Sequence, residues 1–285
     1  MSKIDPNKLL LTSDFFSIQG EGISSGIPSY FIRLGICNLT CGMSNKFLNQ
    51  LVKDKSLADG EIFVGDLHES GQATWTCDST SQWALRGEDT DFQYLIDKWK
   101  TEGLYEDILK GNIRVIWTGG EPTILGHQLS IINFHKYWED QVGLHNLYTE
   151  YMEPKFYNEI ETNGTNYITE DLFKLISQIN CSPKLSNSGM TAKQRINPKA
   201  IIRVMQHTNY QFKFVISNEE DIQEIFRDFV IPFGIPLSKV VCMPGLDDVA
   251  EFSERTRFVM EMAKKYRFRG LTRLHIAAWN KTLNV

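Results

Sequence analysis

Long apolar runs are missing from this sequence: none approaches the roughly 20 residues that a membrane-spanning helix needs. Dense blocks of lysine and arginine are missing as well, and the net charge of −5 is mild. Neither a membrane partner nor a nucleic-acid-binding surface is therefore indicated. The first 16 residues lack the apolar stretch of a secretion signal, which predicts a cytoplasmic protein.

Cysteine is scarce and odd in number. An odd set in a reducing compartment argues against a disulfide framework and leaves metal binding, catalysis or burial. The five positions are Cys37, Cys41, Cys77, Cys181 and Cys242. The last two lie beside strand-like segments and match no metal-site spacing, so we expect them to be buried structural thiols.

What the chain does contain is a regular alternation of short apolar runs and helical periods. Strand-like runs occupy 113–117, 156–161, 210–216 and 239–243, and helical patterns follow at 124–138, 169–179, 219–230 and 248–266. Alternation of this kind predicts an α/β fold with a mainly parallel sheet, either open or closed into a barrel.

Polar motifs follow three of these predicted strands. They are TGGEP (118–122), ETNG (161–164) and MPG (243–245). In parallel α/β folds the chemistry gathers at the carboxyl ends of the strands. The position of these motifs therefore predicts one site built from several strand ends.

The segment 42–76 interrupts this rhythm inside what we expect to be a single domain, 1–285. It mixes lysine, aspartate, glycine and serine, with a short helix predicted near 45–53. Insertions of this length within a compact domain are often functional. We expect it to fold aside as a lid or a surface for a partner.

Two cysteines with three residues between them, Cys37 and Cys41, suggest a metal site, and Cys77 is the candidate third ligand. Lengthening the loop between the second and third ligands from two residues to 35 costs roughly 2.5 kcal/mol of loop-closure entropy. Metal binding by thiolates contributes roughly 10–16 kcal/mol, judged from structural zinc sites, so a loop of this length is compatible with one site. Three thiolates leave one iron of a [4Fe–4S] cluster open to a ligand. A zinc site with His68 as fourth ligand, or three unrelated buried thiols, are the other interpretations of the spacing.

Flanking motifs favour the cluster. In chain order they are FFSIQGEG (15–22), SYFIRLGICNLTC (29–41), TCDST (76–80), TGGEP (118–122), ETNGT (161–165), SPK (182–184) and LHIAAW (274–279). Together these motifs resemble the radical S-adenosylmethionine (SAM) superfamily and, within it, the 7-carboxy-7-deazaguanine synthases. The resemblance runs from residue 15 to the C-terminus and implies a partial (β/α) barrel.

The sequence departs from the family's pattern in three places. The family usually separates its second and third cysteines by two residues, whereas this chain carries the insertion there. The family's Cys-Asp-Thr is Cys77-Asp78-Ser79, and the glycine usual before the first cysteine is Ile36, with Gly35 one place earlier.

By resemblance, Cys37, Cys41 and Cys77 hold a [4Fe–4S] cluster whose open iron chelates SAM. The residues that the resemblance assigns to SAM are Thr76, Asp78, Gly120, Glu121, Thr162, Asn163, Ser182, Pro183, Lys184, Gln211 and Lys213. Strand alternation puts Gln211 and Lys213 on one face, which either points at SAM or is solvated. The family's Mg²⁺ ligand corresponds to Ser79, with Thr80 as the alternative.

The resemblance also implies the reaction: 6-carboxy-5,6,7,8-tetrahydropterin becomes 7-carboxy-7-deazaguanine with loss of ammonia, a step towards preQ0, queuosine-type and other 7-deazapurines. It assigns the substrate to Ile18, Gln19, Gly20, Glu21, Arg33, Thr118 and His275. Arg33 suits the substrate carboxylate because its guanidinium can pair bidentately. A flavodoxin-like electron donor and a homodimer are implied as partners.

Two other functions remain open from the residues. Another radical SAM activity, such as a glycyl-radical activating enzyme, would share the cysteines and GGEP but need not share IQGEG or Arg33. A non-catalytic iron–sulfur or zinc binding module, with the 42–76 segment docking a protein, would bind metal without cleaving SAM.

Overall fold

The structure is a computed structural model, and it describes residues 4–43, 73–77, 79, 87–146 (without the side chains of 144–146), 156–245, 249–280 and 282. The strands are β1 (Leu9–Ile18), β2 (Pro28–Leu34), β3 (Glu88–Thr90), β4 (Arg114–Gly119), β5 (Asn158–Thr162), β6 (Gln178–Cys181), β7 (Tyr210–Ile216), β8 (Val240–Pro244) and β9 (Arg269–Gly270).

These strands form one sheet in the order β3-β1-β2-β4-β5-β6-β7-β8-β9. From β2 to β9 every neighbouring pair is parallel, whereas β1 runs antiparallel to both β2 and β3. The two ends of the sheet are not paired with each other, so the barrel is partial rather than closed. The predicted α/β fold with a mainly parallel sheet is confirmed.

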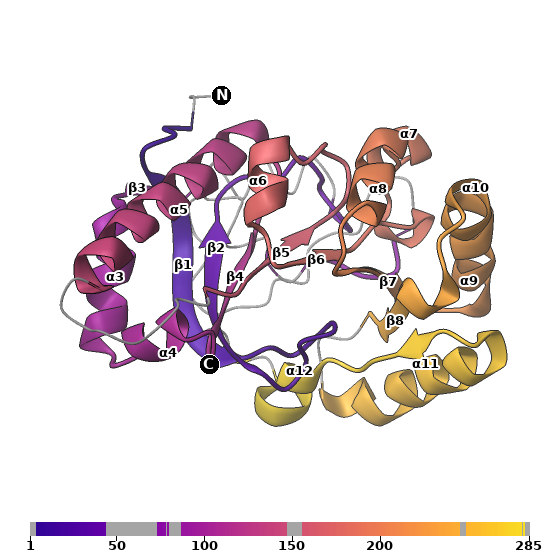
Figure 1. Cartoon of the computed structure of the whole chain (residues 1–285). Helices are drawn as coiled ribbons and strands as arrows, with labels where there is room; N and C mark the ends of the chain where they lie inside the picture. The colour runs from indigo at the N-terminus through magenta and orange to yellow at the C-terminus, as the bar shows by residue number, and fades with distance from the viewer. Residues whose placement is uncertain are drawn as a thin grey trace.

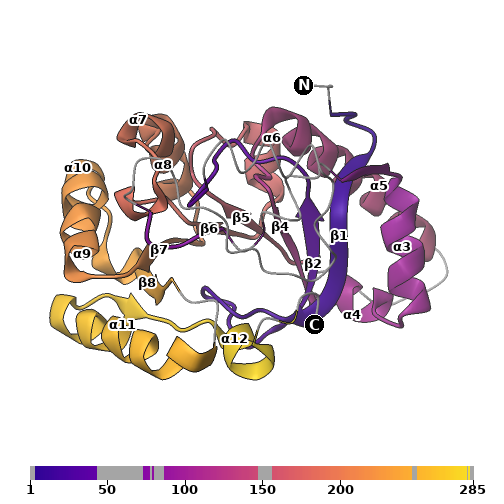
Figure 2. The same ribbon diagram turned by 180° about the vertical axis from the view of Figure 1, so that it is seen from behind.

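Helices cover the outer side of this curved sheet, as Figures 1 and 2 show from opposite directions. They are α3 (Phe92–Thr101), α4 (Tyr105–Leu109), α5 (Leu125–Asn146), α6 (Glu170–Leu175), α7 (Ala192–Arg195), α8 (Pro198–Met205), α9 (Glu219–Ile225), α10 (Ile231–Phe233), α11 (Phe252–Tyr266) and α12 (Leu274–Trp279). Short 3₁₀ turns lie at η1 (Ser186–Ser188), η3 (Leu237–Lys239) and η4 (Val249–Glu251), and η2 (Phe226–Val230) is a π-helical turn. No helix among the described residues is long and apolar enough to cross a bilayer.

The strands are apolar on their outer face and polar on their inner face. In β7, Phe212, Phe214 and Ile216 belong to the main hydrophobic core, while Gln211 and Lys213 point the other way and are still buried. Successive side chains of a strand point to opposite faces of the sheet. Alternating apolar and polar residues therefore give an outer face that packs against the helices and an inner face that is polar. The inner face of the sheet is therefore where chemistry can be placed.

All four predicted strands are present, and helices follow at the predicted positions, with one correction. The helix expected over 169–179 is wrong beyond Leu175, because Gln178–Cys181 forms the buried strand β6. The backbone turns extended at Ile176, but Ile176 and Ile179 continue the apolar spacing of the helix and hide the boundary. Most of the insertion, including the helix expected near 45–53, lies outside the described residues.

Candidate active site

A cavity of about 500 Å³ opens at the carboxyl ends of the parallel strands. Its walls come from the ends of β2, β4, β5, β7 and β8, from the loop after β1, from the cysteine segments and from α12. This volume falls in the usual range for small-molecule sites, roughly 300–1,000 Å³. The polar motifs that follow the predicted strands therefore line one cavity, as their positions predicted.

Nearly all the residues assigned from the sequence line this one cavity. They are Ile18, Gln19, Gly20, Glu21, Arg33, Cys37, Cys41, Thr76, Cys77, Ser79, Thr118, Gly120, Glu121, Thr162, Asn163, Ser182, Lys184, Lys213 and His275. Gln211 and Pro183 are not among the lining residues. Asp78 and Thr80, like His68, lie outside the described residues.

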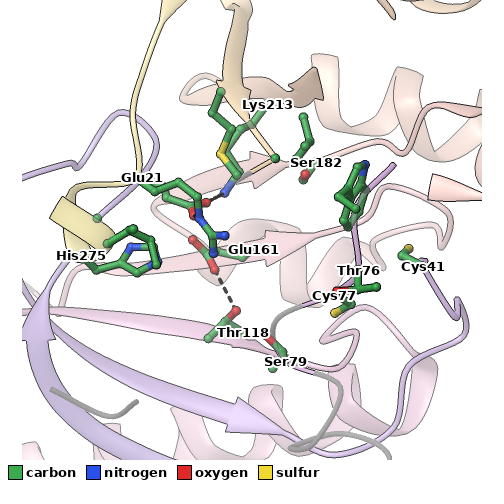
Figure 3. Close-up of a pocket in the computed structure, with 18 of the residues that line it drawn as sticks. Glu21, Cys41, Thr76, Cys77, Ser79, Thr118, Glu161, Ser182, Lys213 and His275 are labelled. Atoms are coloured by element: carbon green, nitrogen blue, oxygen red, sulfur yellow. Dashed lines mark hydrogen bonds and ion pairs between the residues drawn. The ribbon is translucent and has the colours of Figure 1, made fainter. Parts of the chain in front are cut away.

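The three candidate cluster ligands gather at one end of the cavity. Cys41 packs with Leu39 and Met190 in a small apolar cluster against which Cys37, Cys77 and Trp75 also pack. The backbone N–H of Cys77 donates to the carbonyl of Cys41 at 3.2 Å, so the insertion does not keep the third cysteine away from the second. Figure 3 shows the Cys41 and Cys77 sulfurs in this part of the site.

The environment of these thiols affects their ionisation. Burial, Glu121 and Cys41 raise the pKa of Cys37 well above its usual value. Burial also raises the pKa of Cys41 to about 12, against the opposing charge of Lys184. Metal binding at these thiols would release protons, because the thiolate is the form that binds a metal.

The donor set suits an iron–sulfur cluster. Three thiols that share an apolar pocket are the soft ligands that such clusters use. Within the described part of the chain, no three Cys, His, Asp or Glu side chains converge on a point where a single ion could sit. In a cubane cluster each thiolate binds a different iron, so three ligands need not meet at one point.

A tight backbone contact joins the first cysteine segment to the TGGEP motif. Ile36 has a φ of 64°, in the left-handed region that disfavours β-branched residues. Its carbonyl accepts from the N–H of Glu121 at 2.9 Å and lies 1.9 Å from the place of a Cβ on Gly120. Position 120 must therefore be glycine. The left-handed backbone at position 36 would also explain a glycine there, because glycine adopts a positive φ without strain.

The carboxylate of Glu121 is buried and fully engaged within the protein. It accepts from the N–H groups of Thr123 at 2.9 Å and Asn163 at 2.7 Å, and from the hydroxyls of Thr162 at 2.7 Å and Thr123. Burial raises its pKa, and these hydrogen bonds act in the opposite direction. Glu121 thus joins the ends of β4 and β5 at the cavity wall.

At the other end of the cavity Glu21 lies between two cations. It accepts from the ammonium of Lys213 and, at 2.9 Å, from Nε of Arg273 (Figure 3 shows Glu21 beside Lys213). Burial alone would raise the pKa of Glu21, but Lys213, Arg273 and His275 outweigh it and hold the pKa well below its usual range. Glu21 therefore presents a fixed negative charge.

A second carboxylate, Glu161, organises the floor between these two ends. Its Oε2 accepts from the hydroxyl of Thr118 at 2.7 Å, and its Oε1 accepts from Nε2 of Gln19 at 3.1 Å. The Oε1 of Gln19 in turn accepts from the N–H of Glu21 at 3.1 Å. Strands β4 and β5 thereby fix the loop that carries Gln19 and Glu21.

Two further predicted residues are held by aromatic or backbone contacts. The guanidinium of Arg33 lies 4.7 Å from the ring centre of Phe15. A Cβ on Gly20 would lie 2.3 Å from Nδ1 of His275, so the imidazole packs directly on the backbone of that loop. The N–H of Leu274 also donates to the carbonyl of Gly20 at 3.0 Å, which joins α12 to the same loop.

Gln211 belongs to a buried polar network below the cavity rather than to its wall. Its Nε2 donates to Asn180 at 3.0 Å, and Asn180 donates to Glu159 at 2.8 Å. Glu159 also pairs with Arg114 at 2.7 Å and accepts from Ser24. The solvated face considered for Gln211 and Lys213 is wrong, since both side chains are buried inside the sheet.

Sequence reasoning missed several lining residues, among them Glu161 and Arg273. A signal existed for Glu161, because the period of two in 156–161 puts it on the same face as Glu159. Arg273 carries no such signal: its role depends on Glu21, which is 252 residues away in the chain. Cys181 and Cys242 are fully buried, as predicted.

No family model matches this chain. Its sequence is nevertheless similar to curated proteins over most of its length. The chain is 29% identical over 270 residues to 7-carboxy-7-deazaguanine synthase of Pyrobaculum aerophilum, with 93% of this chain and 92% of that protein covered. It is 26% identical over 288 residues to the synthase of the same name from Halobacterium salinarum, with 93% and 88% covered.

A solved structure supports the fold. The chain matches the crystal structure of QueE from Escherichia coli with a TM-score of 0.54 and 19% sequence identity, covering 94% of this chain and 95% of that one. At this identity the match concerns the fold, which extends over nearly the whole length of both chains.

Proposed function

We propose that the chain is a 7-carboxy-7-deazaguanine synthase of the radical SAM type, which converts 6-carboxy-5,6,7,8-tetrahydropterin to 7-carboxy-7-deazaguanine with loss of ammonia. The observation that carries the proposal is the single cavity, which has three thiols at one end and an acid held between two cations at the other. This arrangement supports a cluster pocket and a polar substrate pocket within one enclosure.

The family uses a [4Fe–4S] cluster and SAM, and Cys37, Cys41 and Cys77 would hold that cluster here. Bound together and given one electron by the reductant, the cluster and SAM would supply the radical chemistry for hydrogen-atom abstraction from the substrate. The protein positions both ligands and keeps water away. The ammonium of Lys184, 5.6 Å from the Trp75 ring centre, suits the carboxylate of SAM, and Gly120 lines the same cavity beside the first cysteine segment.

Substrate recognition falls to the opposite end of the cavity. Arg33, held against Phe15, pairs with the substrate carboxylate. Glu21 stays ionised and accepts hydrogen bonds from the pterin amino groups. Thr118 and His275 complete this wall, and Glu161 keeps Thr118 and Gln19 in place.

Ser79 is the proposed Mg²⁺ ligand. It lies two residues after Cys77 and lines the cavity. A hydroxyl oxygen is a ligand of the kind that Mg²⁺ accepts. We predict that Ser79→Ala raises the Mg²⁺ concentration for half-maximal turnover by about tenfold or more, while Ser79→Thr preserves it. An unchanged Mg²⁺ dependence in Ser79→Ala would remove Ser79 as a ligand.

The proposal extends to the setting and the partners of the enzyme. All five cysteines are free, which suits a reducing cytoplasmic compartment. A flavodoxin-like protein is the proposed electron donor, and a homodimer is the proposed assembly. Sedimentation of the reconstituted protein, alone and with a flavodoxin, measures both interactions.

The decisive experiment uses anaerobically reconstituted protein with SAM, a reductant, Mg²⁺ and 6-carboxytetrahydropterin, with products identified by mass spectrometry. We expect 7-carboxy-7-deazaguanine and 5′-deoxyadenosine together. 5′-Deoxyadenosine without the deazaguanine would keep the radical chemistry and overturn the substrate. Neither product, from protein that carries its cluster, would favour the non-catalytic binding module.

A further inference from the structure

The insertion creates a structural problem at the cluster. Residues 42–76 separate Cys77 from Cys41, so sequence proximity cannot place the third thiol as it does in relatives with two intervening residues. Ordering the returning segment costs conformational free energy that local contacts must offset. The contacts of residues 73–77 therefore show what positions Cys77.

Two hydrogen bonds of this segment meet at one buried residue outside the cysteine motif, while the hydroxyl of Thr74 lies 2.8 Å from that of Ser217 and the N–H of Cys77 donates to the carbonyl of Cys41. Nε1 of Trp75 donates to Oδ1 of Asn187 at 2.9 Å, and the N–H of Thr74 donates to the carbonyl of Asn187 at 2.9 Å. Nδ2 of Asn187 donates to the carbonyl of Val215 at 3.0 Å, at the end of β7. Asn187 is only 4% exposed, so these bonds are shielded from water.

The neighbouring residue holds the other side of the interruption. The carbonyl of Ser188 accepts from the N–H of Gly42, directly after the second cysteine, at 2.8 Å. The turn η1, which contains both residues, is itself fixed because Glu224 of α9 accepts from the N–H of Ser186 at 2.8 Å and is paired with Arg195. Both edges of the insertion are thus attached to one rigid turn.

We propose that Asn187 is a positioning residue for the iron–sulfur cluster: it anchors Thr74 and Trp75 to the end of β7 and so places Cys77 beside Cys41. The inference rests on the proposed function in that it takes the three cysteines as cluster ligands. It goes beyond that function by assigning the geometry of the interrupted motif to a residue far from it in sequence.

Two variants separate the anchoring bond from its surroundings. Trp75→Phe removes the indole donor and keeps the aromatic bulk, whereas Asn187→Ala removes the side-chain acceptor and donor together. The matched control is Asn158→Ala, since Asn158 is also buried and donates to a backbone carbonyl, that of Leu175 at 2.9 Å, at the start of β5. Full-length protein is reconstituted anaerobically for all variants and for the double variant.

The readouts are iron and sulfide per chain, the rate of cluster loss in excess chelator, and the urea midpoint of the apoprotein. Loss of one hydrogen bond changes a rate or equilibrium constant by roughly two- to tenfold. The rate of cluster loss should therefore rise by about that factor in Trp75→Phe and in Asn187→Ala. The double variant should lose the cluster no faster than Asn187→Ala, because the two residues share one bond. Asn158→Ala should lower the urea midpoint and leave cluster loss unchanged.

Cluster loss at the wild-type rate in both Trp75→Phe and Asn187→Ala would overturn the inference while the proposed function stands. Equal acceleration by Asn158→Ala would overturn it too, because the effect would then follow global stability. If Asn187→Ala fails to fold, Trp75→Phe decides alone. Wild-type protein that takes up no iron and sulfide would overturn the proposed function together with this inference.

Discussion

At the scale of single residues, buried charge is the main feature of the site. Glu21 is paired with Lys213 and Arg273 on the inner face of the sheet. Removal of one partner from such a group leaves a buried charge uncompensated, which typically costs about 3–5 kcal/mol. The cations at Glu21 therefore contribute to the stability of the fold as well as to the site.

We predict that Arg273→Met destabilises the protein by roughly 3 kcal/mol at neutral pH. Because the pKa of folded Glu21 lies below its unfolded value of about 4.5, the stabilisation is present above that pH and is lost on further acidification. Urea unfolding at neutral pH and near pH 4 measures the difference. The control is Arg255→Met, since Arg255 also lines the cavity but pairs with Glu251 in a half-exposed position. An equal loss in both variants would contradict the prediction.

Gly42 permits the backbone crossing next to the second cysteine. Its φ is 79°, and a Cβ there would lie 2.2 Å from the carbonyl oxygen of Trp75. We predict that Gly42→Ala costs more than about 1 kcal/mol and lowers cluster content. Gly103→Ala is the control, because Gly103 has a similar φ of 73° with no atom within 4 Å of the added Cβ. Equal unfolding midpoints for the two variants would show that the clash with Trp75 does not matter.

At the scale of elements, the two described edges of the insertion meet one turn of the chain. Gly42 and Thr74, at the two edges of the insertion, are bonded to the adjacent residues Ser188 and Asn187. Because these two edges are bonded to neighbouring residues of one turn, a linker of a few residues, at about 3.8 Å between consecutive Cα atoms, can join them. A connection much shorter than the natural one could therefore span these two edges.

We predict that replacing residues 44–72 with a short glycine–serine linker preserves the iron and sulfide content of the reconstituted protein. Both anchoring bonds lie outside the replaced segment, and a shorter loop also closes at lower entropic cost. Metal analysis of the two proteins provides the comparison. Loss of the cluster in the shortened chain would show that the insertion itself supports the ligands.

At the scale of the whole molecule, the helices and the sheet enclose titratable groups away from water. His127 and His135 of α5 are buried, and burial lowers the pKa of each to about 4. Nε2 of His127 lies 2.7 Å from the carbonyl of Gly35, close to the first cysteine. Both histidines are neutral in the folded protein at physiological pH.

Stability should consequently fall in mild acid. The unfolded chain binds protons at these histidines below about pH 6.5, whereas the folded chain binds them only below about pH 4, so stability is lost as the pH falls through this window. Between about pH 7.5 and pH 5.5 we expect a loss on the order of 1 kcal/mol per histidine. Urea unfolding of wild type and of His135→Phe tests this. An identical pH dependence in the two proteins would contradict it.

The sequence alone determined the features that repeat locally or have a fixed order. Apolar alternation predicted β4, β5, β7 and β8, and the polar motifs after the strands predicted where the cavity lies. The ordered motifs around Cys37, Cys41 and Cys77 predicted the family. These signals are readable because a strand, a helix and a short motif each depend on residues close together in the chain.

Only the tertiary structure decided which distant residues act together. Asn187 contacts Trp75, 112 residues away in the sequence, and Arg273 contacts Glu21, 252 residues away. Neither pair belongs to a periodic pattern or a short motif from which the contact could be predicted. The end of the helix at Leu175 was hidden for a related reason, because β6 is fixed by its neighbours β5 and β7 rather than by its own four residues. Such contacts form only when the sheet brings the strand ends to one place, and that arrangement is a property of the whole fold.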